Sequence, residues 1–134
     1  MTQDPKDGEH SEAHQKIESG CRQFLQKFGY TSELGIFSGA WRIYREVSLE
    51  NFETVKPKKD RMLLPGMTVT PDLLDAVIKT FATVWRSAQK GALSKNELST
   101  LTRKEALRLG ATDAVSDQLA QFVPACCIEE ENHV

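Results

Sequence analysis

The sequence predicts an all-α protein, a single compact domain of about five helices spanning residues 11–128. Apolar residues recur at intervals of three and four along most of the chain, which is the spacing of one face of an α-helix. Helix-capping residues precede several of these stretches, and glycines follow them. The chain has 134 residues, of which 40% are hydrophobic. That is the size of one domain and supplies enough apolar surface for one core.

The first helix is expected between Ser11 and Gly29, because six apolar residues in this stretch fall on one helical face. A second helix is favoured over residues 33–47, where the aromatic side chains are again spaced by three and four. Apolar and polar residues also alternate from Trp41 onward, as they do in a strand. One short strand or hairpin within residues 40–55 therefore stays open.

The strongest helical signal covers residues 71–90. Thr70 is a plausible N-cap, proline suits the first helical position, and Gly91 follows the last apolar residue. Phe81 and Trp85 lie on the apolar stripe of this helix, so both are predicted to be buried. A proline-containing connector over residues 56–69 precedes it.

Two capping boxes follow, Ser94 to Glu97 and Thr102 to Glu105. They predict short helices at residues 95–101 and 103–109, which can also be fused into one. The last helix is expected to begin at Thr112 and to end at residue 122 or 123, because Pro124 cannot continue a helix without losing a hydrogen bond.

Polar tails are expected on both sides of the domain. Residues 1–10 contain nothing apolar after Met1 and are predicted to be disordered, and residues 129–134 form an acidic C-terminal tail. No apolar stretch is long enough to cross a membrane, and no secretory signal is visible. A cytoplasmic location is the default expectation.

Charge is distributed unevenly although the net charge is only −2. Residues 56–110 are basic and both flanking regions are acidic. Within this basic middle, four cations lie close together, namely Lys56, Lys58, Lys59 and Arg61. We interpret them as a candidate surface for a protein or another anionic partner. The same run has the look of a nuclear-import signal, which leaves a nuclear location open for a eukaryotic protein.

Residues 102–123 also match part of a helix-turn-helix, with Ala106 as the small residue of the first helix and Gly110 in the turn. The side chains that would contact DNA are Arg103, Lys104, Arg108, Ser116 and Gln118. The would-be recognition helix carries two aspartates and no lysine or arginine, which disfavours binding to a phosphate-lined groove.

The sequence predicts no catalytic residues, no metal site and no cofactor. His10 and His14 have a spacing that can bring two imidazoles to one metal, but no third ligand lies beside them, so solvated side chains are expected. Cys126 and Cys127 lack the spacer that would let both thiolates reach one zinc ion, so apolar packing is expected. Together with Cys21 they are read as reduced thiols.

These observations favour a small non-catalytic protein that binds another protein, as an adaptor, accessory factor or regulatory subunit. The alternative is a small nucleic-acid-binding regulator that uses residues 102–123. A homo-oligomer is compatible with both hypotheses, and no membrane partner is expected.

Overall fold

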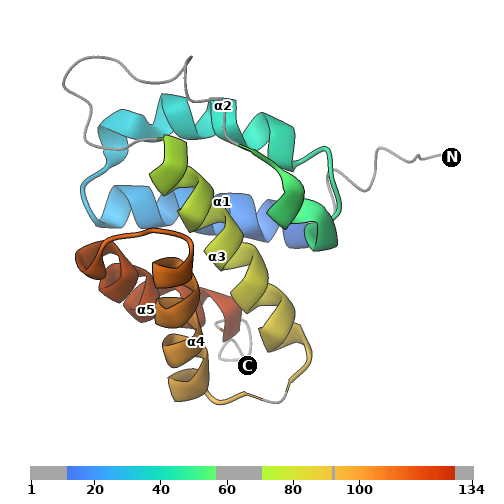
Figure 1. Ribbon diagram of the computed structural model, residues 1–134, viewed down its shortest axis with the longest axis vertical. Coiled ribbons are helices and arrows are strands. Elements are labelled where there is room, and N and C mark those ends of the chain that lie inside the picture. The colour runs from blue at the N-terminus through green and yellow to red at the C-terminus, as the bar shows by residue number, and fades with distance from the viewer. Residues whose placement is uncertain (1–11, 57–70, 92, 129–134) are drawn as a thin grey trace, which may run out of the picture.

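The computed structural model describes residues 12–56, 71–91 and 93–128 and contains five α-helices and two 3-10 helices in these ranges (Figure 1). In chain order they are α1 (Glu12–Lys27), η2 (Thr31–Glu33), α2 (Leu34–Tyr44), η3 (Leu49–Thr54), α3 (Pro71–Gln89), α4 (Lys95–Arg108) and α5 (Asp113–Ile128). The described residues form no strand, so the all-α prediction is confirmed. The predicted tails, residues 1–10 and 129–134, lie outside the described residues.

Helix α3 is the centre of the fold and packs against every other α-helix and against η3 (Figure 1). Its apolar stripe is buried along most of its length and includes Leu74, Val77, Ile78, Phe81 and Val84. Burial of apolar side chains at this spacing is the main source of stability for a helix in a globular protein. The prediction for Trp85 is wrong in part, because its side chain is only partly buried.

An aromatic cluster fills the space between α1, α2 and η3. Trp41 packs against Phe37, Tyr44 and Phe52 with ring centroids about 6 Å apart. His14 of α1 joins this cluster: it is buried, and its Nε2 donates a hydrogen bond to the backbone carbonyl of Val47 over 2.8 Å. The expectation of a solvated His14 is therefore wrong, while His10 lies outside the described residues.

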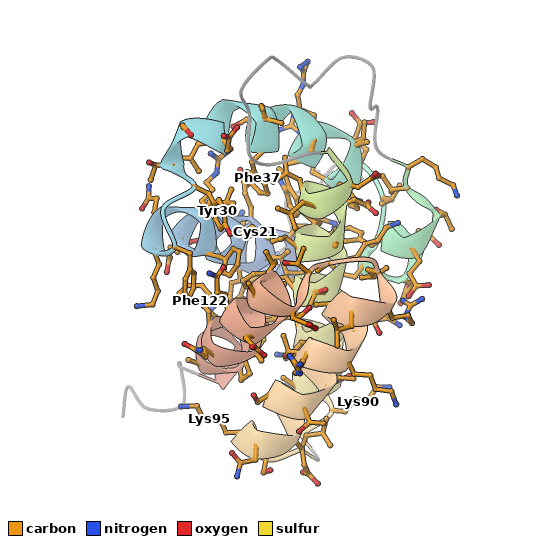
Figure 2. The ribbon with its side chains drawn as sticks, turned by 60° about the vertical axis from the view of Figure 1, so that its left-hand side comes forward. Cys21, Tyr30, Phe37, Lys90, Lys95 and Phe122 are labelled. Atoms are coloured by element: carbon orange, nitrogen blue, oxygen red, sulfur yellow. The ribbon has the colours of Figure 1, made fainter. Side chains whose placement is uncertain are left out.

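A second aromatic cluster joins α1 to α5. The ring centroid of Phe122 in α5 lies 6.0–6.3 Å from the ring centroids of Phe24 and Phe28 in α1 and of Phe81 in α3. In Figure 2, Cys21 and Phe37 lie in the interior and Phe122 is partly buried against it, whereas Lys95 points outward. The two clusters and the α3 stripe belong to one continuous core.

Several predicted helix ends are confirmed. Gly29, Gly91 and Gly110 follow helices and have φ values of 87°, 74° and 99°, a conformation that side chains other than glycine rarely adopt. The capping box at the start of α4 is complete. The Glu97 N–H donates to Ser94 Oγ over 3.2 Å, and the Ser94 N–H donates to the Glu97 carboxylate over 2.7 Å.

The second capping box does not form, because residues 95–108 make one continuous helix. Thr102 lies inside it and is fully buried, and its hydroxyl donates to the carbonyl of Leu98 over 2.6 Å. A threonine can bond back to the carbonyl four residues earlier as readily as it can cap a helix. The sequence pattern alone does not separate these two roles.

Helix α5 also continues through Pro124 to Ile128, so the expected stop at residue 122 or 123 is wrong. Proline removes the N–H that would bond to the carbonyl of residue 120. That carbonyl instead accepts a hydrogen bond from the Ser99 hydroxyl of α4 over 3.1 Å. A side chain from the neighbouring helix thus satisfies the group that the proline leaves open.

Candidate functional site

The basic cluster predicted from the sequence lies mostly outside the described residues. Lys56 follows η3 and is exposed. Lys58, Lys59 and Arg61 belong to the stretch that the structure does not describe. Their role as a binding surface stays a prediction.

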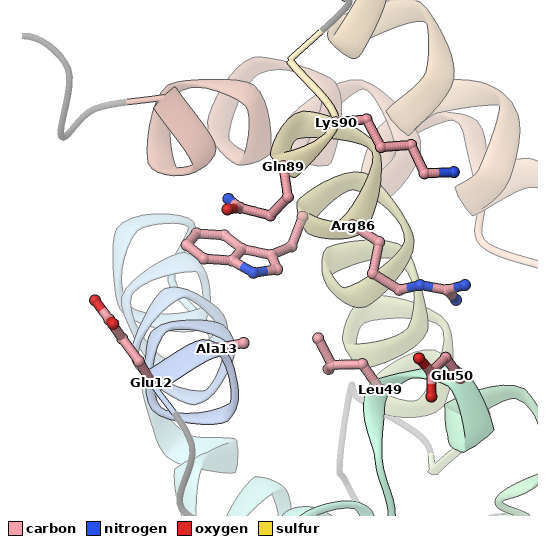
Figure 3. A pocket seen from close by; sticks show the side chains of 8 residues that line it. Glu12, Ala13, Leu49, Glu50, Arg86, Gln89 and Lys90 are labelled. Atoms are coloured by element: carbon pink, nitrogen blue, oxygen red, sulfur yellow. The ribbon is translucent and has the colours of Figure 1, made fainter.

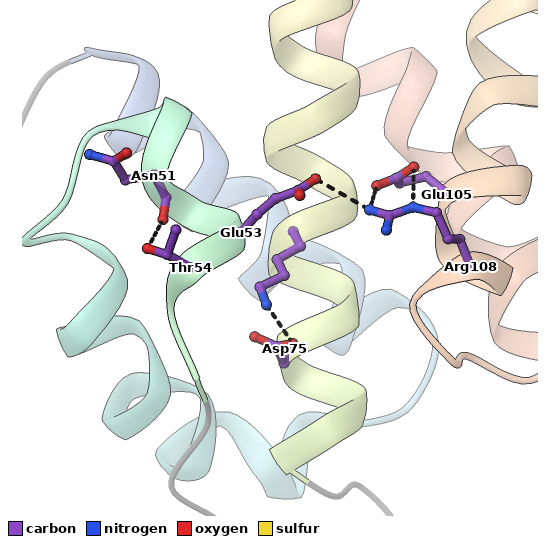
Figure 4. Close-up of polar contacts among 7 residues, drawn as sticks. Asn51, Glu53, Thr54, Asp75, Glu105 and Arg108 are labelled. Atoms are coloured by element: carbon purple, nitrogen blue, oxygen red, sulfur yellow. Dashed lines mark hydrogen bonds and ion pairs between the residues drawn. The ribbon is translucent and has the colours of Figure 1, made fainter.

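Two of the three predicted DNA-contacting cations of the helix-turn-helix segment, Arg103 and Arg108, form ion pairs with carboxylates of the same chain. Arg103 hydrogen-bonds to Asp117 and also lies 3.9 Å from Asp113. Arg108 bonds to Glu105 and reaches across to Glu53 of η3 over 3.2 Å (Figure 4). These ion pairs neutralise the positive charges that would be needed to bind the phosphates of a nucleic-acid backbone.

Of the two residues predicted to contact bases, Ser116 is buried and Gln118 is engaged by another side chain of the protein. Ser116 is 0% exposed, and its hydroxyl has no hydrogen-bond partner. Gln118 is half-buried, and its Oε1 accepts a hydrogen bond from the Tyr30 hydroxyl over 3.3 Å. Direct readout requires side chains that reach base edges from the protein surface. The placement of Ser116 and Gln118 therefore counts against the predicted base contacts.

Lys104 differs from the other two cations of this segment. Its side chain is exposed and forms no ion pair with any residue that the structure describes. It lies in a groove between α4 and α5, with a volume of about 570 Å³. The lining comprises Ser99, Thr100, Arg103, Lys104, Leu107, Asp117, Ala120 and Gln121.

A hollow of the same volume, about 570 Å³, lies where the C-terminal part of α3 passes α1 and η3 (Figure 3). We call it the Trp85 pocket. It is lined by Glu12 and Ala13 of α1, by Leu49 and Glu50 of η3, and by Trp85, Arg86, Gln89 and Lys90 of α3. None of these residues was among the sequence-predicted site residues.

The pocket arises from the way α3 extends beyond the core. Trp85 follows Phe81 by four residues and therefore lies on the same helical face. Phe81 is 3% exposed, whereas Trp85 is covered only in part. The side chains opposite it include the small Ala13, so the indole borders a hollow instead of a packed core. The Nζ of Lys16 lies 6.0 Å from the centre of the indole ring, within the range of a cation–π contact.

The charged residues of the Trp85 pocket fall into two groups. Glu12 lies 3.9 Å from Lys16, and Glu50 accepts a hydrogen bond from the Ser48 hydroxyl over 3.3 Å. In contrast, the side chains of Arg86 and Lys90 form neither an ion pair nor a hydrogen bond with any described residue. The α3 wall of the pocket thus carries two cations that are available to a ligand.

One ion pair within the first half of α3 is nearly buried. Lys79 and Asp75 are 3.1 Å apart and only 10% and 15% exposed (Figure 4). Burial raises the pKa of Asp75 above its usual value, and the neighbouring ammonium of Lys79 lowers it by a smaller amount. Because desolvation outweighs the attraction of Lys79, the folded state favours the protonated form of Asp75 more than the unfolded chain does.

The cysteines form no disulfide. Cys21 and Cys127 are buried, and burial raises the pKa of both thiols, that of Cys127 to about 12. Cys126 is partly buried and packs against the core, as the sequence predicted. Across the described ranges, histidine, cysteine and acidic side chains nowhere gather in a group of three that could hold a metal ion.

No helix within the described part of the chain is both long and apolar enough to cross a membrane. No protein-family model matches the sequence, and neither the curated proteins nor the solved structures contain a match.

Proposed function

We propose that this protein is a non-catalytic binding protein whose partner is another protein, and that a segment of this partner docks in the Trp85 pocket. The observation that carries the proposal is the combination of a partly buried tryptophan with two unpaired cations, Arg86 and Lys90, on the same wall. Tryptophan and arginine are the residue types that most often dominate the energy of protein interfaces.

The composition of the pocket favours a peptide segment over a small molecule. The pocket is open to solvent, and half of the residues that line it are charged. Sites for small molecules are more enclosed and mainly apolar. An open hollow with one aromatic surface instead suits the side chain of a protein partner, which needs an apolar contact surrounded by polar ones.

The charges of the pocket specify the partner further. An apolar side chain placed against the indole of Trp85 would bring its neighbours close to Arg86 and Lys90. A carboxylate at that position can pair with either cation without breaking an existing ion pair. The proposed ligand is therefore a segment with an aromatic or aliphatic residue followed by aspartate or glutamate. The basic run that begins at Lys56 would attract the same acidic partner and raise its association rate.

A selection from a library of displayed random peptides on the immobilised full chain tests this proposal. We expect enriched peptides that combine an apolar residue with acidic ones. The Trp41→Phe variant leaves Trp85 as the only tryptophan of the chain, so its fluorescence reports directly on the pocket. Binding of a selected peptide should change the emission of this variant.

Two further variants locate the binding site. Trp85→Ala and the double variant Arg86→Glu/Lys90→Glu should each weaken peptide binding at least about tenfold, the effect of losing one interface anchor. Arg42→Glu is the matched control, because Arg42 is an exposed arginine on α2 that does not line the pocket. Circular dichroism establishes that each variant is folded. Selected peptides that bind every variant equally would refute the proposal, and sequence-selective DNA binding at submicromolar affinity would replace it with the nucleic-acid alternative.

A further inference from the structure

The groove between α4 and α5 presents an exposed apolar side chain at the surface of the molecule. Leu107 of α4 is 40% exposed and lines the groove, as does Ala120 of α5. Leu93 is the other large apolar residue that the described part of the chain exposes, and it lies outside the groove. A partner that covers Leu107 would remove this apolar surface from water, which favours association.

The two helices that form the groove carry opposite charges. Cations Arg103 and Lys104 line the α4 side, and Asp117 lines the α5 side. Asp113, one turn earlier on α5, is 82% exposed. Arg103 is paired with Asp117 and also lies 3.9 Å from Asp113, so Lys104 is the charged residue of the groove without an ion pair among the described residues. Asp113 keeps most of its carboxylate exposed to an external partner.

We infer that this groove is a contact surface between two copies of the chain, related by a two-fold axis. A partner of a single charge sign would leave either the cations or the carboxylates facing a like charge. A second copy matches both groups, because rotation about a two-fold axis that runs along the groove places α4 of each chain over α5 of the other. In that arrangement Lys104 of each copy approaches Asp113 of the other, and the two Leu107 side chains meet near the axis.

The size of the groove sets the strength of this contact. A stable protein interface buries about 800 Å² on each partner, and one exposed leucine with a few charged neighbours covers less. The dimer should therefore be weak and should depend on both concentration and salt. It uses α4 and α5, whereas the Trp85 pocket uses α1, η3 and α3, so the two proposals are independent.

Sedimentation velocity of the full chain, from low micromolar to millimolar concentration, tests the inference. We expect a monomer at the lower end and a growing dimer fraction at the upper end. Leu107→Arg should abolish the dimer, and Leu93→Arg should leave it intact, because it makes the same change at the exposed leucine outside the groove. A monomer at every concentration, or an equal response to both substitutions, would overturn the inference.

A charge exchange tests the proposed register. Lys104→Glu and Asp113→Lys should each reduce dimerisation, because each places two like charges against one another. The double variant Lys104→Glu/Asp113→Lys restores opposite charges and should recover the dimer. Thermal unfolding shows whether the variants are folded. Folded single variants that dimerise as well as the unchanged chain, or a folded double variant that stays monomeric, would contradict this arrangement.

Discussion

Substitution of Gly20 by alanine tests the close contact between α1 and α3. A Cβ atom at Gly20 would lie 2.6 Å from Cε1 of Phe81 and 3.2 Å from Cδ1 of the same ring. Carbon atoms in contact are normally about 3.5–4.0 Å apart, so the added methyl group overlaps the ring by about 1 Å. Phe81 is 3% exposed and packs edge to face against Phe122, so it cannot move without disturbing the core.

Two opposing effects determine the size of the change. Overpacking of a core costs about 1–3 kcal/mol. Replacing glycine by alanine inside a helix stabilises the folded state by about 1 kcal/mol, because the unfolded chain loses backbone entropy. We therefore expect Gly20→Ala to lower the free energy of unfolding by up to about 2 kcal/mol. Gly35→Ala is the matched control, because nothing lies within 4 Å of a Cβ at that helical position. It should be neutral or stabilise the protein by up to about 1 kcal/mol.

Urea denaturation followed by circular dichroism measures both changes. The variant Phe81→Leu shortens the side chain that the new methyl group would meet, although it creates a cavity of its own. If the overlap is the cause, Gly20→Ala should be tolerated better in the Phe81→Leu background than in the unchanged chain. Equal stability of Gly20→Ala and Gly35→Ala would refute the reasoning, as would strict additivity of Gly20→Ala and Phe81→Leu.

Three further predictions follow from the polar contacts and the thiols. Ser99→Ala should lower the free energy of unfolding by about 1 kcal/mol in urea titrations, because the carbonyl of Ala120 loses the donor that replaces the missing proline N–H. Lys79→Met should destabilise the protein by about 3 kcal/mol at neutral pH, because it leaves the Asp75 carboxylate nearly buried and unpaired. The raised pKa of Asp75 means that the folded state holds the proton of the Asp75 carboxyl group more tightly than the unfolded state does. Stability is therefore lost as the pH rises through the folded-state pKa of Asp75. The loss of unfolding free energy in Lys79→Met should therefore shrink as the pH is lowered toward that pKa. A loss that stays constant with pH would exclude the unpaired Asp75 carboxylate as its cause. Titration with a thiol reagent at neutral pH should modify Cys126 alone among the three cysteines in the native protein, and all three after denaturation, because the other two are buried. Rapid modification of every cysteine in the native protein would contradict their burial.

Local signals in the sequence predict most of the helix ends correctly. The positive φ at Gly29, Gly91 and Gly110 is a requirement of the backbone that glycine meets best, so position along the chain is enough to anticipate it. The capping box at Ser94 is similarly local, since its two hydrogen bonds join residues three positions apart. Such features do not depend on which helix becomes the neighbour.

The errors arise where a distant residue decides the outcome. Pro124 removes one hydrogen bond from α5, and within one helix this loss would end the element. Ser99, 25 positions earlier in the chain, provides the replacement only because α4 packs against α5. His14 follows the same logic, because its partner Val47 is 33 residues away. Neither partner can be identified from periodicity or spacing.

The candidate binding site shows the same limit for function. The apolar spacing of residues 71–90 assigns Trp85 to the buried face of α3, and that face is correct. How deeply a side chain on this face is buried depends on what lies opposite it, and opposite Trp85 lie Ala13 and Leu49, from two elements that are remote in sequence. The hydrophobic pattern therefore predicts a core residue where the fold produces a partly exposed aromatic surface. Arg86 and Lys90 become relevant to binding only through this difference, because a tryptophan that was fully buried would leave them as ordinary surface cations.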